Sequence, residues 1–201
     1  MSTFDVRDVK AVVGKAAAAM VGLEQELNAA DAKLGDGDTG GMLARVISAI
    51  DKAAIPSDED IGACFSAYAK AAAVATGSSL GTLFATALMA FARETKGQSA
   101  VPVSELAPLL VKARDAMMAR GGAKLGDKTV LDAIDAAAQA LEGVGDTAEA
   151  KAKAVEATAD VLVAFRGKPN KIGRARMFAD QTIGLDDPGM LAFAKLCEAI
   201  V

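Results

Sequence analysis

The chain has 201 residues and a net charge of −4, which is enough length for one domain with a full hydrophobic core. Hydrophobic residues make up 52% but aromatic residues only 4%, so the apolar content is mainly Ala, Val, Leu, Ile and Met, which favours helices. The acidic balance argues against a nucleic-acid partner, and the absence of histidine excludes any mechanism that needs an imidazole from this chain.

Helical periodicity of apolar residues runs along the whole chain and is broken by Gly, Pro, Ser and Asp. Ser57 is expected to open the third helix with Asp60 as its capping-box partner, and Asp187 to cap the last one with Pro188 at its first position. The predicted helices span residues 5–28, 39–50, from 57 onward, 79–95, 104–120, 128–141, 147–165 and 188–200, with a shorter helical turn at 175–180. Alternating β-branched runs are missing, so we expect an all-α, single-domain antiparallel bundle or ring of eight helices over residues 1–201.

Four polar, glycine-rich loops stand out, at residues 31–42, 76–83, 121–130 and 167–189. They follow the first, third, fifth and seventh predicted helices. Because alternate connections of an up-and-down bundle lie at the same end, we expect all four loops to form one rim.

The first loop carries Asp31, Asp36 and Asp38 among four glycines. Glycine allows tight turns that can aim carboxylates at a common point, and carboxylates are hard ligands suited to Mg²⁺ or Ca²⁺. An EF-hand does not fit, because Ile47 stands where that motif needs a bidentate Glu. The alternative is that Asp31 merely ends one helix and Asp38 caps the next, but a carboxylate at a helix C-terminus opposes the macrodipole, which suggests a function.

The other three loops suggest phosphate binding, and each also has an ordinary structural explanation. Ser78 and Ser79 precede an apolar helix and form either an anion site or an ordinary N-cap. The third loop, GGAKLGDK, fails as a Walker A motif because Asp127 stands where lysine is required, although its glycines allow a nucleotide close approach. In the fourth loop Lys171, Arg174 and Arg176 could meet phosphate or form a solvated basic loop.

Electrostatics then requires a metal if a nucleotide binds here. Three aspartates facing a polyphosphate would repel it, by about 3 kcal/mol for each unit-charge pair at ~5 Å and an effective dielectric of ~20. Divalent ions that bridge carboxylates to phosphate oxygens reverse the sign of these interactions. We therefore expect nucleotide and Mg²⁺ together.

Three motifs together resemble the nucleotide-binding subunit of dihydroxyacetone kinase: Asp31-x4-Asp36-Gly-Asp38-Thr39-Gly40, the run Gly126 to Thr129, and Gly173-Arg174-Ala175 followed by Ile183-Gly184 and Asp187-Pro188-Gly189. The resemblance covers essentially the whole chain. It implies an eight-helix antiparallel barrel with ADP or ATP at one end and a separate subunit that binds the ketone covalently through its own histidine.

The resemblance also implies residue roles. Asp31, Asp36 and Asp38 would hold two Mg²⁺ ions. Our own hypothesis adds that Arg174, with Lys128, offsets charge on the transferred phosphoryl group. The remaining nucleotide-binding residues would be Thr39, Gly40, Gly41, Met42, Ser78 and Ser79 on the phosphate side, Gly121 and Val130 around base and ribose, and Asp187, Pro188 and Gly189 with Arg174 at the closing turn.

The functional hypothesis is a subunit that passes a phosphoryl group from Mg-nucleotide to dihydroxyacetone held by a partner subunit. The donor is either ATP or a phosphotransferase-system protein that rephosphorylates bound ADP. Alternatives are a related kinase of a tetrulose or fatty acid, a non-catalytic nucleotide-sensing module, and a plain bundle whose aspartates are caps.

The cysteines and apolar runs bear on the compartment. Cys64 and Cys197 lie in apolar surroundings, as buried thiols do. The apolar run at residues 80–92 is shorter than the ~20 residues that span a bilayer, and residues 1–10 lack the apolar core of a secretory signal. We expect a cytoplasmic protein with no membrane partner.

Overall fold

The computed structural model describes residues 2–201, so Met1, with which the expected domain begins, lies outside the described residues. Within this range the chain forms α1 (Val6–Asp31), α2 (Thr39–Asp51), α3 (Ile61–Ala75), α4 (Ser79–Glu94), α5 (Leu106–Gly121), α6 (Val130–Ala140), α7 (Thr147–Arg166) and α8 (Pro188–Ala199). Two short strands, β1 (Thr3–Asp5) and β2 (Ala100–Pro102), and two 3-10 helices, η1 (Val103–Glu105) and η2 (Ala175–Thr182), complete the described elements.

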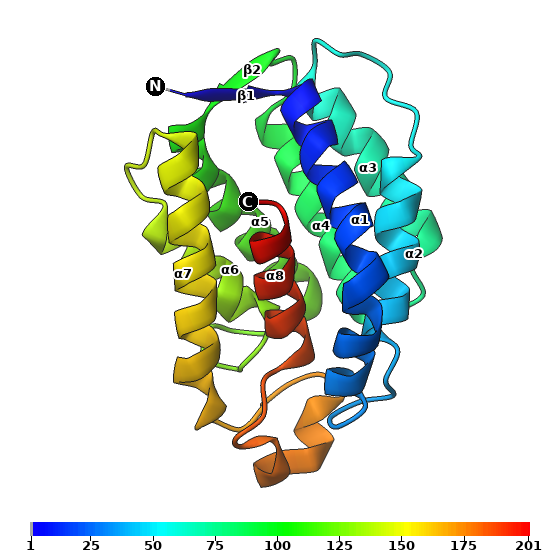
Figure 1. Cartoon of the computed structure of the whole chain (residues 1–201), viewed down its shortest axis with the longest axis vertical. Helices are drawn as coiled ribbons and strands as arrows, with labels where there is room; N and C mark the ends of the chain where they lie inside the picture. The colour runs from blue at the N-terminus through cyan, green and yellow to red at the C-terminus, as the bar shows by residue number, and fades with distance from the viewer. Residues whose placement is uncertain (1) are drawn as a thin grey trace.

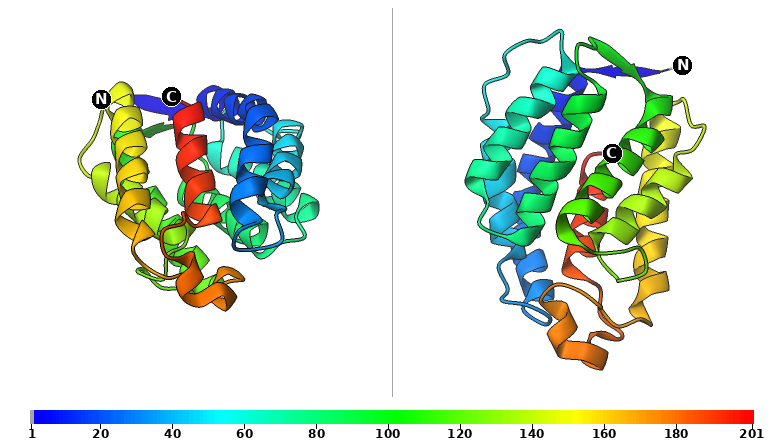
Figure 2. Two further views of the ribbon diagram at one scale, coloured as in Figure 1. Left: turned by 60° about the horizontal axis from the view of Figure 1, so that its bottom comes forward. Right: turned by 180° about the vertical axis from the view of Figure 1, so that it is seen from behind.

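The helices close into a ring (Figures 1 and 2). Each α-helix packs against the next one along the chain, and α8 packs against α1 and also against α6. This arrangement confirms the antiparallel all-α barrel of eight helices predicted from the sequence.

The core lies between the helices and is built from small and branched apolar side chains. One cluster joins α1 to α4 through residues such as Leu27, Val46 and Ile61, and a second joins α4 to α6 around Met117 and Leu131. Buried alanines on the inner faces keep the helices close together. Within residues 2–201 none of the helices combines the length and the apolar character that crossing a membrane requires.

The third helix begins later than the sequence indicated. Ser57 does not open it: its hydroxyl accepts a hydrogen bond from the Glu59 N–H in a turn, and α3 starts at Ile61. Asp60 is the N-cap, and its carboxylate accepts from the N–H of Ala63 and that of Gly97, both at 3.0 Å. The helix starts here because one carboxylate serves both α3 and the turn after α4.

Three other boundaries also differ from the expectation. The first helix runs on to Asp31, and the fifth begins at Leu106 after the 3-10 turn η1. The sixth begins at Val130, because Thr129 is its N-cap and forms a capping box with Asp132. The prediction for α8 is confirmed, with Asp187 Oδ1 accepting from the Met190 N–H at 2.9 Å.

The strand pair was not predicted, because three residues are too few to show alternation. β1 and β2 pair antiparallel with Phe4 opposite Val101. The ribbon lies at the end of the ring opposite η2 (Figure 1). It therefore fastens the start of the chain away from the four polar loops.

A close helix approach at Gly62 gives a test of the fold. A Cβ at Gly62 would lie 2.5 Å from Lys96 Cα and 2.7 Å from Ala92 O, whereas a Cβ at Gly22 meets nothing within 4 Å. We expect Gly62→Ala to lower the free energy of unfolding by about 1–3 kcal/mol through overpacking. The control Gly22→Ala, in the interior of α1, should raise it by roughly 0.5–1 kcal/mol. Urea unfolding measures both, and a Gly62→Ala protein at least as stable as wild type would contradict this packing.

Candidate functional site

The four polar loops lie at one end of the ring, as the alternation of connections predicted (Figures 1 and 2). They are the connections after α1, α3, α5 and α7. Contacts join them across the ring: a Cβ at Gly189 would lie 3.4 Å from Val130 Cβ and 3.7 Å from Leu80 Cδ1. The start of α8 therefore meets the first turns of α4 and α6.

The three aspartates of the first loop converge. Asp31, Asp36 and Asp38 each offer a carboxylate oxygen, and these oxygens lie within 4.8 Å of one another. Asp31 is only 8% exposed, while Asp36 and Asp38 face solvent. Three carboxylate oxygens at this spacing are a suitable donor set for a hard divalent cation such as Mg²⁺.

Asp31 explains how the cluster is held. Its Oδ2 accepts hydrogen bonds from the backbone N–H of Asp38 at 3.0 Å and of Thr39 at 3.3 Å. The carboxylate at the end of α1 thus lies at the N-terminus of α2, where a negative charge is stabilised by the helix macrodipole. Asp38 occupies the N-cap position of α2 but makes no side-chain capping bond, so its carboxylate stays available to a ligand.

An arginine from the fourth loop neutralises part of this charge. The Nη1 of Arg174 pairs with Asp36 Oδ2, and the Arg174 side chain is 62% exposed. An exposed ion pair contributes only about 0–1 kcal/mol, so a cation with stronger attraction to the carboxylate can displace the guanidinium. The pair brings the tip of the fourth loop to the acidic cluster.

The residues expected on the phosphate side lie near the cluster but differ in exposure. Thr39, Gly40 and Met42 are buried, while Gly41 is half-buried and donates its N–H to Asn28 Oδ1 at 3.1 Å. A Cβ at Gly40 would lie 2.0 Å from Glu24 O, so glycine is required there for α1 and α2 to touch. Packing therefore accounts for Gly40 without any ligand.

The serine loop has one capping and one exposed hydroxyl. Ser78 is the N-cap of α4 and accepts from the Gly81 N–H at 3.0 Å, which is the ordinary N-cap interpretation. Ser79 is the first residue of the helix and is exposed. Its hydroxyl and the first-turn N–H groups of α4 form a surface that can accept an anion.

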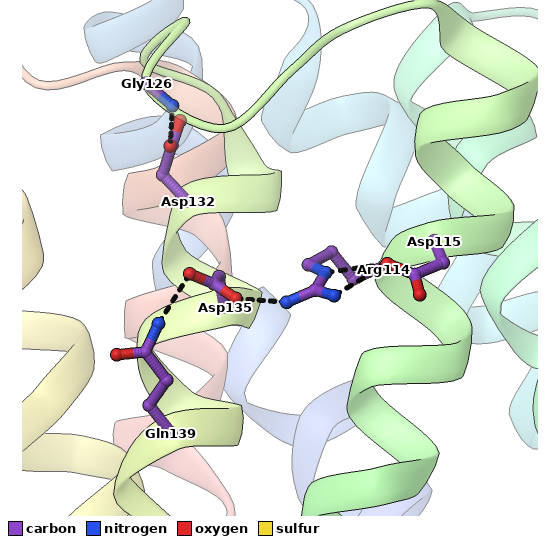
Figure 3. Close-up of polar contacts among 6 residues, drawn as sticks. All are labelled: Arg114, Asp115, Gly126, Asp132, Asp135 and Gln139. Carbon is purple, nitrogen blue, oxygen red and sulfur yellow. Dashed lines mark hydrogen bonds and ion pairs between the residues drawn. The ribbon is translucent and has the colours of Figure 1, made fainter.

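The third loop is folded around a buried carboxylate, Asp132 (Figure 3). Asp132 Oδ1 accepts from the Gly126 N–H at 2.6 Å and Oδ2 from the Thr129 N–H at 2.8 Å. On the next turn of α6 Asp135 pairs with Arg114 of α5 (Figure 3). The loop thus has a fixed shape, beside the exposed Gly121 and the half-buried Val130.

Lys128 lies elsewhere than the sequence suggested. We expected its ammonium to face phosphate, but the side chain points into the protein and is 1% exposed. Its Nζ donates to the carbonyl oxygens of Lys168 at 2.8 Å and Thr182 at 2.9 Å. Its backbone φ of 62° is costly for a lysine, by about 1–2 kcal/mol, and turns the side chain inward. Burial lowers the pKa of this ammonium, against the charges of Asp187 and Asp186.

Lys128 belongs to a polar junction that sequence reasoning missed. Asn170 Nδ2 donates to Lys128 O at 2.8 Å and to Asp187 Oδ2 at 2.9 Å, and the Asn170 N–H donates to Thr182 Oγ1. Asn170 and Thr182 are buried. The signal available in the sequence was weak, since both residues look like ordinary loop polar residues.

Burial raises the pKa of Asp187 from its ordinary value of 3.8 to about 6, although hydrogen bonds from Met190 and Asn170 and the charge of Lys128 oppose the rise. A carboxyl whose pKa is higher in the folded state binds its proton more tightly there. Its contribution to the free energy of unfolding therefore falls as the pH rises from about 4 to 6.

A pH titration of stability tests this assignment. We expect the free energy of unfolding of the wild type, relative to Asp187→Asn, to fall by roughly 2–3 kcal/mol between pH 4 and 6.5. Asp146→Asn, which changes the exposed N-cap of α7, is the matched control for loss of a capping carboxylate. Parallel pH profiles for wild type and Asp187→Asn would contradict the raised pKa.

Comparison with known proteins agrees with this geometry. Residues 33–201 match the DAK2 domain. The D-erythrulose kinase of Mycolicibacterium smegmatis is 35% identical over 192 residues, which cover 92% of this chain and 33% of that kinase. The ADP-binding subunit DhaL of the PEP-dependent dihydroxyacetone kinase of Escherichia coli is 27% identical over 81% of this chain and 80% of its own length.

The fold is similar to that of a solved kinase. The crystal structure of the dihydroxyacetone kinase of C. freundii superposes with a TM-score of 0.71 at 25% identity, over 95% of this chain and 33% of that one. The chain spans about a third of the length of the erythrulose kinases that it matches. Its motifs, its ring of helices and the domain match agree, and the chain belongs to the DAK2 domain family, whose relatives named here are kinases.

Proposed function

We propose that this chain binds a magnesium nucleotide at the four-loop end and presents its terminal phosphoryl group to a small hydroxyketone held covalently by a partner subunit. The observation that supports this most is the convergence of Asp31, Asp36 and Asp38. The E. coli relative is named as an ADP-binding subunit, and a second crystal structure of the C. freundii dihydroxyacetone kinase is a complex with AMP-PNP and Mg²⁺.

The proposed ligand sites follow the loops. Asp31, Asp36 and Asp38 would hold two Mg²⁺ ions, which when bound neutralise phosphate charge and polarise the group being transferred. The proposed nucleotide contacts are Thr39, Gly40, Gly41, Met42, Ser78 and Ser79 on the phosphate side, Gly121 and Val130 at the base and ribose, and Asp187, Pro188 and Gly189 at the turn before α8. Thr39, Gly40 and Met42 are buried. The Thr39 N–H already donates to Asp31 Oδ2 and the Met42 N–H to Asp38 O, so the N–H of Gly40 is the proposed backbone contact in the first turn of α2.

Arg174 is proposed to change partner on ligand binding. Its guanidinium pairs with Asp36 in the structure, and the side chains of the two residues are 62% and 46% exposed. Once cations occupy the carboxylates, the arginine is free to contact phosphate oxygens, for which its planar donor set is suited. The work of this chain is then positioning and charge neutralisation, as phosphoryl transfer requires.

The relatives support two candidate substrates, and the proposed donor is either ATP or a phosphotransferase-system protein. Dihydroxyacetone fits the kinase named for the E. coli subunit, of which the matched region covers 80%, and a tetrulose fits the erythrulose kinases at 35% and 31% identity. A phosphotransferase-linked system keeps ADP bound and rephosphorylates it, whereas an ATP-dependent one exchanges nucleotide. Retention of ADP by the purified protein through extensive dialysis would favour the first donor.

Asp36→Asn tests the proposed site. We expect the variant to lose Mg²⁺-dependent binding of ADP and ATP by at least roughly tenfold, because one exposed ligand to the cations is lost while helicity stays near that of wild type. Isothermal titration with each nucleotide, with and without Mg²⁺, gives the measurement.

The matched control is Asp51→Asn, an exposed aspartate at the opposite end of α2, which should bind nucleotide like wild type. Nucleotide affinity that is equal in wild type and Asp36→Asn, or independent of Mg²⁺, would refute the metal assignment.

Phosphoryl transfer in mixtures with the partner subunit, offered dihydroxyacetone or erythrulose, then separates the two substrates.

A further inference from the structure

The segment between α7 and α8 folds back on itself, so that its two ends lie together. The Gly184 N–H donates to Arg166 O at 2.7 Å, and the Asn170 N–H donates to Thr182 Oγ1 at 2.9 Å. Residues 171–181 form the part beyond this neck, and Arg174 lies in it. In Figure 1 this segment lies at the foot of the ring, beyond the ends of the helices.

Lys128 closes the neck from outside the segment. Its Nζ bridges Lys168 O on the outgoing strand of the loop and Thr182 O on the returning one, at 2.8 and 2.9 Å. Because the ammonium is buried, water cannot replace these two bonds in place. An apolar side chain would remove the donor to Lys168 O and would leave Thr182 O with the Leu185 N–H at 3.3 Å.

The surroundings of Lys128 hold it in this position. Asn170 donates to the Lys128 carbonyl, and the Lys171 N–H donates to Asp127 O at 3.0 Å, so the third and fourth loops are joined on both sides of the lysine. The carboxylate of Asp132, on α6, fixes the third loop by accepting hydrogen bonds from the N–H groups of Gly126 and Thr129. The fourth loop is therefore fastened to a fixed support.

At the far side of the neck, Arg174 reaches Asp36 of the acidic cluster. A chain of contacts thus runs from Lys128 through the loop neck to the cluster. The Lys128 ammonium touches none of the three aspartates of the cluster, since it is directed to two carbonyls inside the protein. The Lys128 carbonyl is joined through Asn170 to Asp187, one of the proposed nucleotide contacts.

We propose that Lys128 is a positioning residue. It holds together the two ends of the fourth loop, at Lys168 and Thr182, so that Arg174 lies over the acidic cluster. This inference rests on the proposed nucleotide site and deepens it: the Lys128 side chain acts on nucleotide affinity through the loop that carries Arg174. It predicts that the aspartates stay in place when Lys128 is changed, while the loop does not. The Asn170 bridge to Asp187 uses the Lys128 backbone carbonyl, which Lys128→Met retains.

The first test needs no nucleotide. Lys128→Met keeps the length of the side chain and removes its donors. Trypsin should then cut after Lys171, Arg174 or Arg176 about tenfold faster than in wild type, because the loop opens locally, while the circular dichroism spectrum stays unchanged. Fragments are identified by mass spectrometry.

Lys124→Met, the same change at an exposed position of the third loop, is the control and should be cut like wild type. If Lys128→Met does not fold, Thr182→Val, which removes the hydroxyl at the neck without removing a charge, replaces it with the same expectation. Loop cleavage at the wild-type rate would overturn the proposal.

The second test is a double-mutant cycle on Mg-ADP affinity. Lys128→Met and Arg174→Met should each weaken binding by roughly tenfold, and the double variant should be no weaker than Arg174→Met alone, within about twofold. If the double variant instead lost affinity by the product of the two single losses, Lys128 would act independently of Arg174, and the inference would be overturned. If wild type binds no Mg-ADP, the proposed function fails, and tryptic cleavage alone decides whether Lys128 holds the loop.

Discussion

The carboxylate of Asp31 is the interaction on which the candidate site depends. Asp31 ends α1, where a negative charge is destabilised by the dipole of that helix. Its carboxylate accepts hydrogen bonds from two N–H groups at the start of α2, and the dipole of α2 stabilises the charge there. These two bonds draw the N-cap of α2, and with it Asp38, toward the end of α1. The acidic cluster is therefore a consequence of how two helices are joined, and it leaves two of its three carboxylates facing outward for a ligand.

Much of the fold could be predicted, because it depends on the spacing of apolar residues and on whether a connection is odd- or even-numbered along the chain. Apolar residues at helical spacing located the helices, and the alternation of long helices with short connections placed the four polar loops at one end. The convergence of Asp31, Asp36 and Asp38 followed from glycines between carboxylates. The helix starts at Ile61 and Val130 were harder, because Asp60 and Thr129 cap these helices through contacts that sequence spacing alone does not rank.

The role of Lys128 could not be predicted for a different reason. A lysine beside glycines and an aspartate suggests a phosphate contact, and only the left-handed backbone at that residue and the two carbonyls it reaches show that it faces inward. Both acceptors lie far along the chain, in a segment without helical periodicity. The same holds for Asn170 and Thr182, whose partners come from three separate segments. Buried polar junctions between loops depend on tertiary geometry, which local patterns do not contain.

The closure of α8 onto α1 has a thermodynamic consequence. The loops that meet at one end are drawn from nearly the whole length of the chain, so an open ring, or any fragment of it, has no such meeting place. A ligand bound there has affinity for the closed ring and little for the unfolded chain, so its binding energy adds to the stability of every helix at once. Ligand occupancy and cooperative unfolding are coupled in this architecture, so under the proposed function the concentration of nucleotide would shift the apparent stability of the whole ring.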